Sequence, residues 1–334
     1  DSKVSRGLGD VYKRQLQRDD SLLEKLSALC KPEWQELLLK VDKKILPIAR
    51  LRDFVFMREV LCICGARDAC IVRDYVFGLP IVGWAFPAPS QVPKETIPCR
   101  DVVDLWTNSA EHNFHIRTST QSSRDLELDA AAWQKTQDEI DKHMIVGPFM
   151  SPEEAGFHRY RSVRRFGIWE MHGGAEERSC RVIDDLLDGE QNSTAGSYWT
   201  HRPCDLDQWC LFLRAVSERF PTLPLSQFAS DFAKAYKQIP LAPWNQEYCI
   251  VVQWHPVLLR PVYLIAITQL FGGRTAPVNF ARFATFCADL CAVLAAIPFV
   301  QCMDDMLCAE PLCSIRSGYT FWRRGSQSFA VGTF

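Results

Sequence analysis

The stretch Phe299–Cys308 constrains the fold more than any other, because it sets two adjacent acids, Asp304 and Asp305, between two short apolar runs. Asp tolerates turn geometry and the flanks suit a buried sheet, so the pattern predicts a strand, a tight turn and a returning strand. Two carboxylates at a hairpin tip repel each other unless a cation lies between them, and magnesium prefers such hard oxygen ligands. Taken alone, the pair is more typical of a solvated turn, so its interpretation depends on the rest of the chain.

A third acid, Asp231, lies upstream and is followed by Ala235-Tyr236 and then by Gln238–Leu241. Three segments occur in order along the chain: Phe228–Leu241, Leu270–Phe280 and Met303–Asp305. In this order they resemble the palm motifs of reverse transcriptases, and the similarity is strongest to the polymerases of retrotransposons. Three ordered motifs are far more specific than the acidic pair alone.

The resemblance covers Leu126–Cys308. It implies an α+β fold, the fingers and palm of a right-hand polymerase, with an antiparallel palm sheet backed by helices. The implied activity is that of an RNA-directed DNA polymerase, a nucleotidyltransferase that adds dNTPs to a primer 3′-hydroxyl on an RNA or DNA template. Because the resemblance fades after Leu307, before a thumb, we expect a fragment with little processive activity.

The resemblance and the local composition divide the chain into five expected parts. These are a disordered tail at 1–15, a helical and irregular extension at 16–125, a fingers-like region at 126–230, a palm with the metal site at 231–310 and an irregular tail at 311–334. Ser5–Gln15 resembles a translated sequencing adaptor, and a genuine basic tail is the alternative. Whether the extension belongs to the catalytic module is left open.

By resemblance, Asp231, Asp304 and Asp305 are the catalytic and metal-binding residues. In two-metal sites the ions lie about 3.5–4 Å apart, and we expect two Mg²⁺ here, with Mn²⁺ as a substitute. One ion would lower the pKa of the primer 3′-hydroxyl, and the other would neutralise the triphosphate. Asp231 and Asp304 are the stronger candidates.

The resemblance also implies a nucleotide-binding set, which comprises Arg181, Phe232, Ala235, Tyr236, Phe271 and Gly272. The ring of Tyr236 would lie under the sugar and exclude a 2′-hydroxyl, which selects deoxynucleotides; packing in the palm core is the alternative. Arg181 would bind the triphosphate, and the carbonyl of Phe232 would complete a coordination shell. Gly272 would let the backbone approach a base pair.

A basic cluster with an interleaved aromatic residue covers His158–Arg165. Its predicted nucleic-acid contacts are Arg161, Arg164 and Arg165, because guanidinium forks match phosphate oxygens. A solvated strand edge is the alternative. The nearby pair Asp184-Asp185 matches a fingers pattern and is not expected to bind metal.

Hydrophobic periodicity predicts the elements around these motifs. The expected helices are 126–144, 206–220 and 277–297, with two further helices in 16–64, the second opening at Pro32. The expected strands are 166–169 and 181–185, joined through Gly173-Gly174, and 248–254 and 262–267. Frequent prolines over 79–99 predict an irregular connector.

The composition is that of an ordinary soluble protein, with 47% hydrophobic residues and a net charge of −2. The 14 cysteines lack zinc-type spacing and no signal peptide is visible, so we expect an intracellular protein, cytoplasmic or nuclear and not secreted. The apolar run over 283–300 contains Asp289 and Pro298, so we expect no membrane span. The oligomeric state is left open.

Three alternatives remain at this level. An RNA-dependent RNA polymerase shares the motif order, but it typically has an acidic residue where this chain has Tyr236. A decayed element would retain a palm-like fold that binds nucleic acid without turnover. An unrelated α/β domain with fortuitous acids would place Asp231 far from Asp304.

Overall fold

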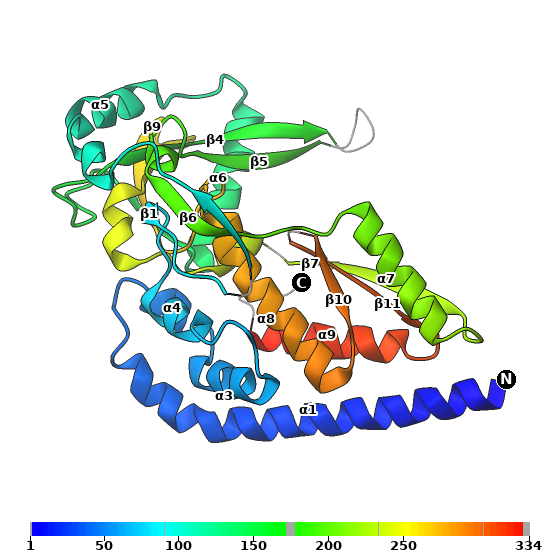
Figure 1. Cartoon of the computed structure of the whole chain (residues 1–334). Coiled ribbons are helices and arrows are strands. Elements are labelled where there is room, and N and C mark those ends of the chain that lie inside the picture. Colours follow the sequence, from blue (N-terminus) through cyan, green and yellow to red (C-terminus); the bar gives the residue numbers. More distant parts are fainter. Residues whose placement is uncertain (1, 90, 172–177, 233, 303, 330–334) are drawn as a thin grey trace.

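The computed structural model describes residues 2–89, 91–171, 178–232, 234–302 and 304–329, and it is a mixed α and β protein (Figure 1). Its helices are α1 (Ser2–Leu38), α2 (Leu46–Ala49), α3 (Phe54–Cys64), α4 (Ile71–Phe77), α5 (Ser109–Ser119), α6 (Leu126–Asp141), α7 (Leu206–Arg219), α8 (Ala276–Ala295) and α9 (Ile315–Phe329). The 3₁₀ helices are η1 (Val102–Trp106), η2 (Gln191–Ser193), η3 (Ala235–Gln238) and η4 (Pro243–Tyr248).

The strands form three sheets among the described residues. They are β1 (Gly83–Trp84), β2 (Val92–Thr96), β3 (Ile145–Phe149), β4 (Ser162–Met171), β5 (Arg178–Asp185), β6 (Ala195–Thr200), β7 (Leu225–Asp231), β8 (Ile250–His255), β9 (Arg260–Ala266), β10 (Phe299–Cys302) and β11 (Asp305–Pro311). The five-stranded sheet has the order β3-β9-β8-β4-β5, the second sheet β10-β11-β7 and the third β1-β6-β2. The short strands β1 and β2 lie within the segment that was expected to be an irregular connector.

The five-stranded sheet contains both predicted strand pairs. β4 and β5 are antiparallel and β8 and β9 are antiparallel, while β4 joins β8 in parallel. The predicted helix over 126–144 is present as α6, which packs on β4 and β5. In Figure 1, β4 and β5 run side by side and extend away from the end of the sheet at which α5 lies. The predicted link through Gly173-Gly174 lies outside the described residues.

The second sheet contains the predicted acidic hairpin. β10 pairs with β11 in antiparallel register, from Phe299 opposite Cys308 to Cys302 opposite Asp305. On its other edge β11 pairs with β7, which ends at Asp231. The predicted strand, turn and returning strand are therefore confirmed, although Met303 lies outside the described residues.

The predicted helix over 277–297 is confirmed as α8, and it forms the centre of the core. Among the described residues, α8 is the one helix long and apolar enough to cross a membrane, but 61% of that apolar window is buried inside the protein. Arg282 in its middle is fully buried, and its guanidinium bonds Asp68 at 2.6 Å and Asp74 at 2.7 Å. α8 is therefore packed as a core helix.

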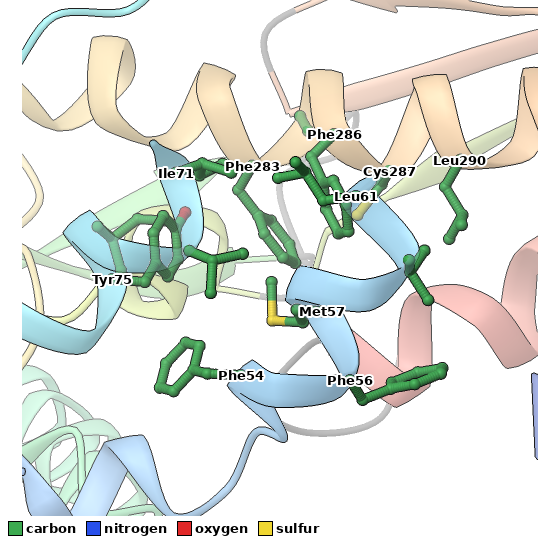
Figure 2. Close-up of a cluster of buried hydrophobic side chains, with 14 of the residues drawn as sticks. Phe54, Phe56, Met57, Leu61, Ile71, Tyr75, Phe283, Phe286, Cys287 and Leu290 are labelled. Atoms are coloured by element: carbon green, nitrogen blue, oxygen red, sulfur yellow. The ribbon is translucent and has the colours of Figure 1, made fainter. Parts of the chain in front are cut away.

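The N-terminal region shares this core. Figure 2 shows side chains of α3 and α4 packed against one face of α8. The buried residues in this contact include Phe54, Met57, Leu61, Tyr75, Phe283, Phe286 and Leu290. Helices α3 and α4 of the extension, whose membership was open from the sequence, thus form one hydrophobic unit with α8.

Two expectations about the N-terminus are wrong. The tail expected to be disordered is helical from Ser2 onward, and Pro32 lies inside the same helix α1 instead of opening a second one. α1 lies against α3, α8 and α9. Cys30 and Trp34, one turn apart on either side of Pro32, are both buried. This packing outweighs the backbone hydrogen bond that a proline removes from a helix.

The expected irregular tail is also wrong over most of its length. Residues 315–329 form α9, which packs beneath β7 and β11. Phe321 and Trp322 are 2% and 1% exposed and belong to the same core as α8. The Trp322 ring lies 4.6 Å from that of Phe299 and 5.5 Å from that of Phe232. α9 therefore supports the sheet that carries the acids.

We predict that Trp322→Ala lowers the free energy of unfolding by about 3–5 kcal/mol, because it opens a cavity beneath the second sheet. Urea denaturation followed by circular dichroism measures the change. The exposed Thr320→Ala on the same helix serves as the control. Equal stability of the two variants would contradict the packing of α9 and would support the irregular tail that the sequence predicted.

Candidate functional site: three carboxylates on adjacent strands

The β7–β11 ladder brings the three predicted acids together. Asp231 is directly opposite Asp305 in the antiparallel register, and Asp304 immediately precedes β11. Residues opposite each other in such a pair have Cβ atoms about 4.5–5.5 Å apart. The arrangement places Asp231 beside the hairpin that carries Asp304 and Asp305.

The electrostatics of the three carboxylates indicate mutual repulsion. Partial burial raises the pKa of Asp231, and the charges of Asp304 and Asp305 raise it further, while the backbone N–H of Phe232 opposes the shift. Burial and the charge of Asp304 also raise the pKa of Asp305. None of the three carboxylates forms a salt bridge with a described side chain. The site therefore carries uncompensated negative charge.

This donor set fits a hard divalent cation. Within the described part of the chain, no group of three or more His, Cys, Asp or Glu side chains is arranged so that it could hold a metal ion by itself. Magnesium does not require such a cage, because it usually binds through one or two carboxylates together with waters and substrate phosphates. The open, unpaired carboxylates of Asp231, Asp304 and Asp305 match that requirement.

Tyr236 lies beside the acids, on η3. Its ring centroid is 5.1 Å from that of Phe271 and 5.9 Å from that of Phe280, and the side chain is half-buried. Burial raises the pKa of Tyr236, the charge of Asp304 raises it further, and the charge of Arg181 lowers it. The Tyr236 phenol is thus within electrostatic reach of both Asp304 and Arg181. Its ring packs against Phe271 and Phe280.

Arg181 is available to a ligand in this arrangement. It lies on β5 opposite Ile168, and its side chain is 54% exposed. Its guanidinium contacts Glu170 at 2.6 Å. Exposed ion pairs of this kind are weak, about 0–1 kcal/mol, so an anionic ligand can displace Glu170.

Phe232 and Ala235 support the site from below. Both side chains are buried, at 1% and 2% exposed. The Phe232 ring meets Phe280 and Phe283 edge to face, as well as Trp322. Their side chains therefore anchor the end of β7 and the start of η3. The expected coordination by the Phe232 carbonyl is a backbone contact and stays a prediction, as does the nucleotide contact of Ala235.

Gly272 is constrained by packing within the chain, and its expected approach to a base pair stays a prediction. Its φ is +92°, and a Cβ added there would lie 2.7 Å from the carbonyl oxygen of Asp184. Its own carbonyl accepts a hydrogen bond from the Asn192 amide at 2.8 Å. The glycine is required for close packing on the end of β5, and this packing sets the position of Phe271 beside Tyr236.

Two of the three predicted nucleic-acid contacts are wrong. Arg161 is fully buried, where it donates to the carbonyls of Gly189 and Leu105 and bonds the carboxylate of Glu190. Arg165 is fully buried and bonds Asp184 at 2.6 Å. The sequence does not show these partners because they come from other elements.

Arg164 is intermediate between these buried residues and a free surface residue. Its side chain is 33% exposed and lies 3.4 Å from Asp185 and 3.7 Å from Asp188. Most of its charge is therefore balanced within the protein, although part of the side chain reaches solvent.

A buried ion cluster, formed by Glu139, Arg165, Asp184 and Lys237, was missed from the sequence. Arg165 contacts Glu139 at 3.0 Å, and the Lys237 ammonium lies 3.3 Å from Glu139 and 3.6 Å from Asp184. Although burial acts to raise it, Lys237 and Arg165 hold the pKa of Glu139 at about 2. The available signal was Lys237 itself, a charged residue directly after Tyr236 in the motif that begins at Phe228. In this cluster Asp184 is paired with Arg165 and Lys237.

Comparison with known proteins adds no family assignment. A scan against models of known protein families finds no match to this chain. A search of curated proteins also finds no match.

We predict that Arg165→Met lowers the free energy of unfolding by about 3–5 kcal/mol, because it removes the guanidinium that hydrogen-bonds the buried carboxylates of Asp184 and Glu139. Arg178→Met on the neighbouring strand removes an exposed pair with Glu127 and serves as the control, with an expected loss of about 1 kcal/mol or less. Urea denaturation compares the two variants. A small loss of unfolding free energy in Arg165→Met would contradict the buried ion pairs and would support the exposed position that the sequence indicated.

We predict that Asp231→Asn stabilises the protein at neutral pH by up to about 1 kcal/mol, after allowance for solvent screening. The folded state raises the pKa of Asp231, so ionisation opposes folding as pH rises through that pKa. The gain should therefore be present near pH 7 and vanish as pH falls toward the unfolded pKa of about 4. Urea denaturation across this range tests the sign, with the exposed Glu95→Gln as the control. A gain that persists at low pH would contradict repulsion among the acids.

Proposed function

We propose that this chain carries the fingers and palm of a reverse transcriptase, an RNA-directed DNA polymerase of the retrotransposon type. The observation that carries the proposal is the β7–β11 register, which sets Asp231 opposite Asp305 with Asp304 adjacent. It is supported by Tyr236, whose phenol lies within electrostatic reach of both Asp304 and Arg181.

The metal ligands in this proposal are Asp231, Asp304 and Asp305. When bound there, magnesium would lower the pKa of the primer 3′-hydroxyl and neutralise charge on the triphosphate. The three acids contribute uncompensated negative charge at the end of two paired strands. The raised pKa values of Asp231 and Asp305 also mean that a bound cation would favour the ionised forms of these two carboxyls.

The reaction forms a bond between the primer 3′-oxygen and the α-phosphorus of a dNTP and breaks the bond to pyrophosphate. The chain forms no covalent intermediate, so its contribution is position and charge. Arg181, released from Glu170, attracts the triphosphate. Phe271 and Phe280 hold the ring of Tyr236, which closes the space that a 2′-hydroxyl would need.

The proposal predicts magnesium-dependent extension of a primer on an RNA template with dNTPs. Asp304→Asn should reduce extension at least about 100-fold, as expected for loss of a group that stabilises charge in the transition state. Tyr236→Ala should retain dNTP use and gain rNTP use, because the excluded volume is removed. Glu95→Gln serves as the matched control, and gel electrophoresis of a labelled primer gives the product lengths.

A second readout does not require turnover. Mg²⁺ should raise the melting temperature of the unaltered chain by mass action and should not raise that of Asp304→Asn. Extension with rNTPs by the unaltered chain would favour an RNA-dependent RNA polymerase. Magnesium binding and nucleic-acid binding without any extension would indicate a non-catalytic remnant. Absence of both extension and magnesium stabilisation would overturn the proposal.

A further inference from the structure

A second candidate site lies on the five-stranded sheet. α5, the segment 158–160 and β9 enclose a pocket of about 350 Å³. In Figure 1, α5 lies at the end of this sheet away from β10 and β11. The pocket is therefore separate from the site formed by the three acids. Its functional side chains are Phe114, Arg117, His158, Arg159, Tyr160 and Tyr263.

The cations of this pocket differ from the arginines that the sequence indicated. Among the described residues, Arg117, His158 and Arg159 form no salt bridge, and Arg117 and Arg159 are exposed. Arg161 and Arg165, only a few positions along the chain, are instead buried in ion pairs. The unbalanced positive charge of the His158–Arg165 cluster is thus at its N-terminal end and faces this pocket.

Aromatic rings orient the cations and form the walls. The Arg159 guanidinium lies 4.1 Å from the centre of the Trp106 ring, and that of Arg117 lies 5.5 Å from the Phe114 ring. Phe114 is 60% exposed, so much of its ring is open to a ligand. Planar exposed rings beside cations provide both a stacking surface and phosphate partners.

The walls are held rigidly. The Asn113 amide donates to the carbonyl of Tyr160, and its carbonyl accepts from the backbone N–H of Ser162, both at 2.8 Å. Burial raises the pKa of Tyr160 and of Tyr263, and the nearby charge of Arg117 lowers both. The charge of Glu153 raises the pKa of both tyrosines. The pocket therefore exists without a ligand and keeps a positive balance.

We propose that this pocket binds single-stranded nucleic acid, with Arg117 and Arg159 on a phosphate and a base stacked on Phe114. A base within a duplex cannot enter a concave pocket, which favours an unpaired strand. The exposed aromatic face distinguishes this ligand from an acidic peptide, which would need only the cations. The inference rests on the proposed function for the identity of the strand, a template held away from the acids.

The test measures binding without catalysis. The probe is a fluorescein-labelled oligouridine about 12 nucleotides long, within the range of single-strand site sizes. Fluorescence anisotropy in EDTA compares the full chain with Arg117→Ala/Arg159→Ala. Lys25→Ala/Lys135→Ala removes two exposed charges from other helices and serves as the matched control.

The charge-deleted variant should bind about tenfold more weakly and lose about 1.4 from the slope of log K against log salt, at about 0.7 for each phosphate contact. Phe114→Ala should weaken binding at least about fivefold, by loss of one stacked base, with the slope unchanged. The control should match the unaltered chain. Equal weakening in the control, or equal displacement of the oligouridine by poly-glutamate, would overturn the proposal.

The two proposals can fail independently. Asp304→Asn should bind the oligouridine as the unaltered chain does, because it leaves this pocket intact. If primer extension is absent while the pocket variants lose binding, the polymerase proposal fails and the strand-binding pocket stands. If extension is present while the pocket variants bind normally, the pocket proposal fails alone.

Discussion

The backbone ladder between β7 and β11 is the interaction on which the candidate site depends. Its register sets Asp231 opposite Asp305, an arrangement that is unfavourable because like charges directly across a sheet repel. The ladder persists because its interior positions are well packed: Met306 and Cys308 are fully buried on the core side. The repulsion is thus confined to the open end of the strands, where a cation can approach.

Asp184 connects the five-stranded sheet to the same site in two ways. Its carboxylate pairs with Arg165 and Lys237, and Lys237 follows Tyr236 directly in η3. Gly272, the residue after Phe271, packs closely against the backbone carbonyl of Asp184. The two rings that pack together beside the acids are therefore both positioned from β5. A cluster of two buried acids and two buried bases holds this junction with no net charge, which limits the cost of burying charges.

Local patterns were sufficient to predict the elements near the motifs. The acidic hairpin, α8 and the paired strands β4 and β5 follow from short-range periodicity and turn chemistry, which operate within a few residues. Partner choice was not predictable in the same way. The sequence around Arg165 does not distinguish it from an exposed arginine. In the structure Arg165 is buried in ion pairs with Asp184 and Glu139, which lie on two other elements. α9 was missed because no motif marks it, although Trp322 is among the most buried side chains of the chain.

The sequence by itself determined the order of the motifs, the strand-turn-strand around Asp304 and Asp305, and the helix that backs them. These features depend on residue type and spacing along the chain. Only the tertiary structure decided that the N-terminal helices share the core of α8, and which arginines face solvent. It also decided that a basic, aromatic pocket lies at α5. Burial, ion pairing and shared surface arise between segments distant in the chain, because folding brings their side chains into a common low-dielectric environment.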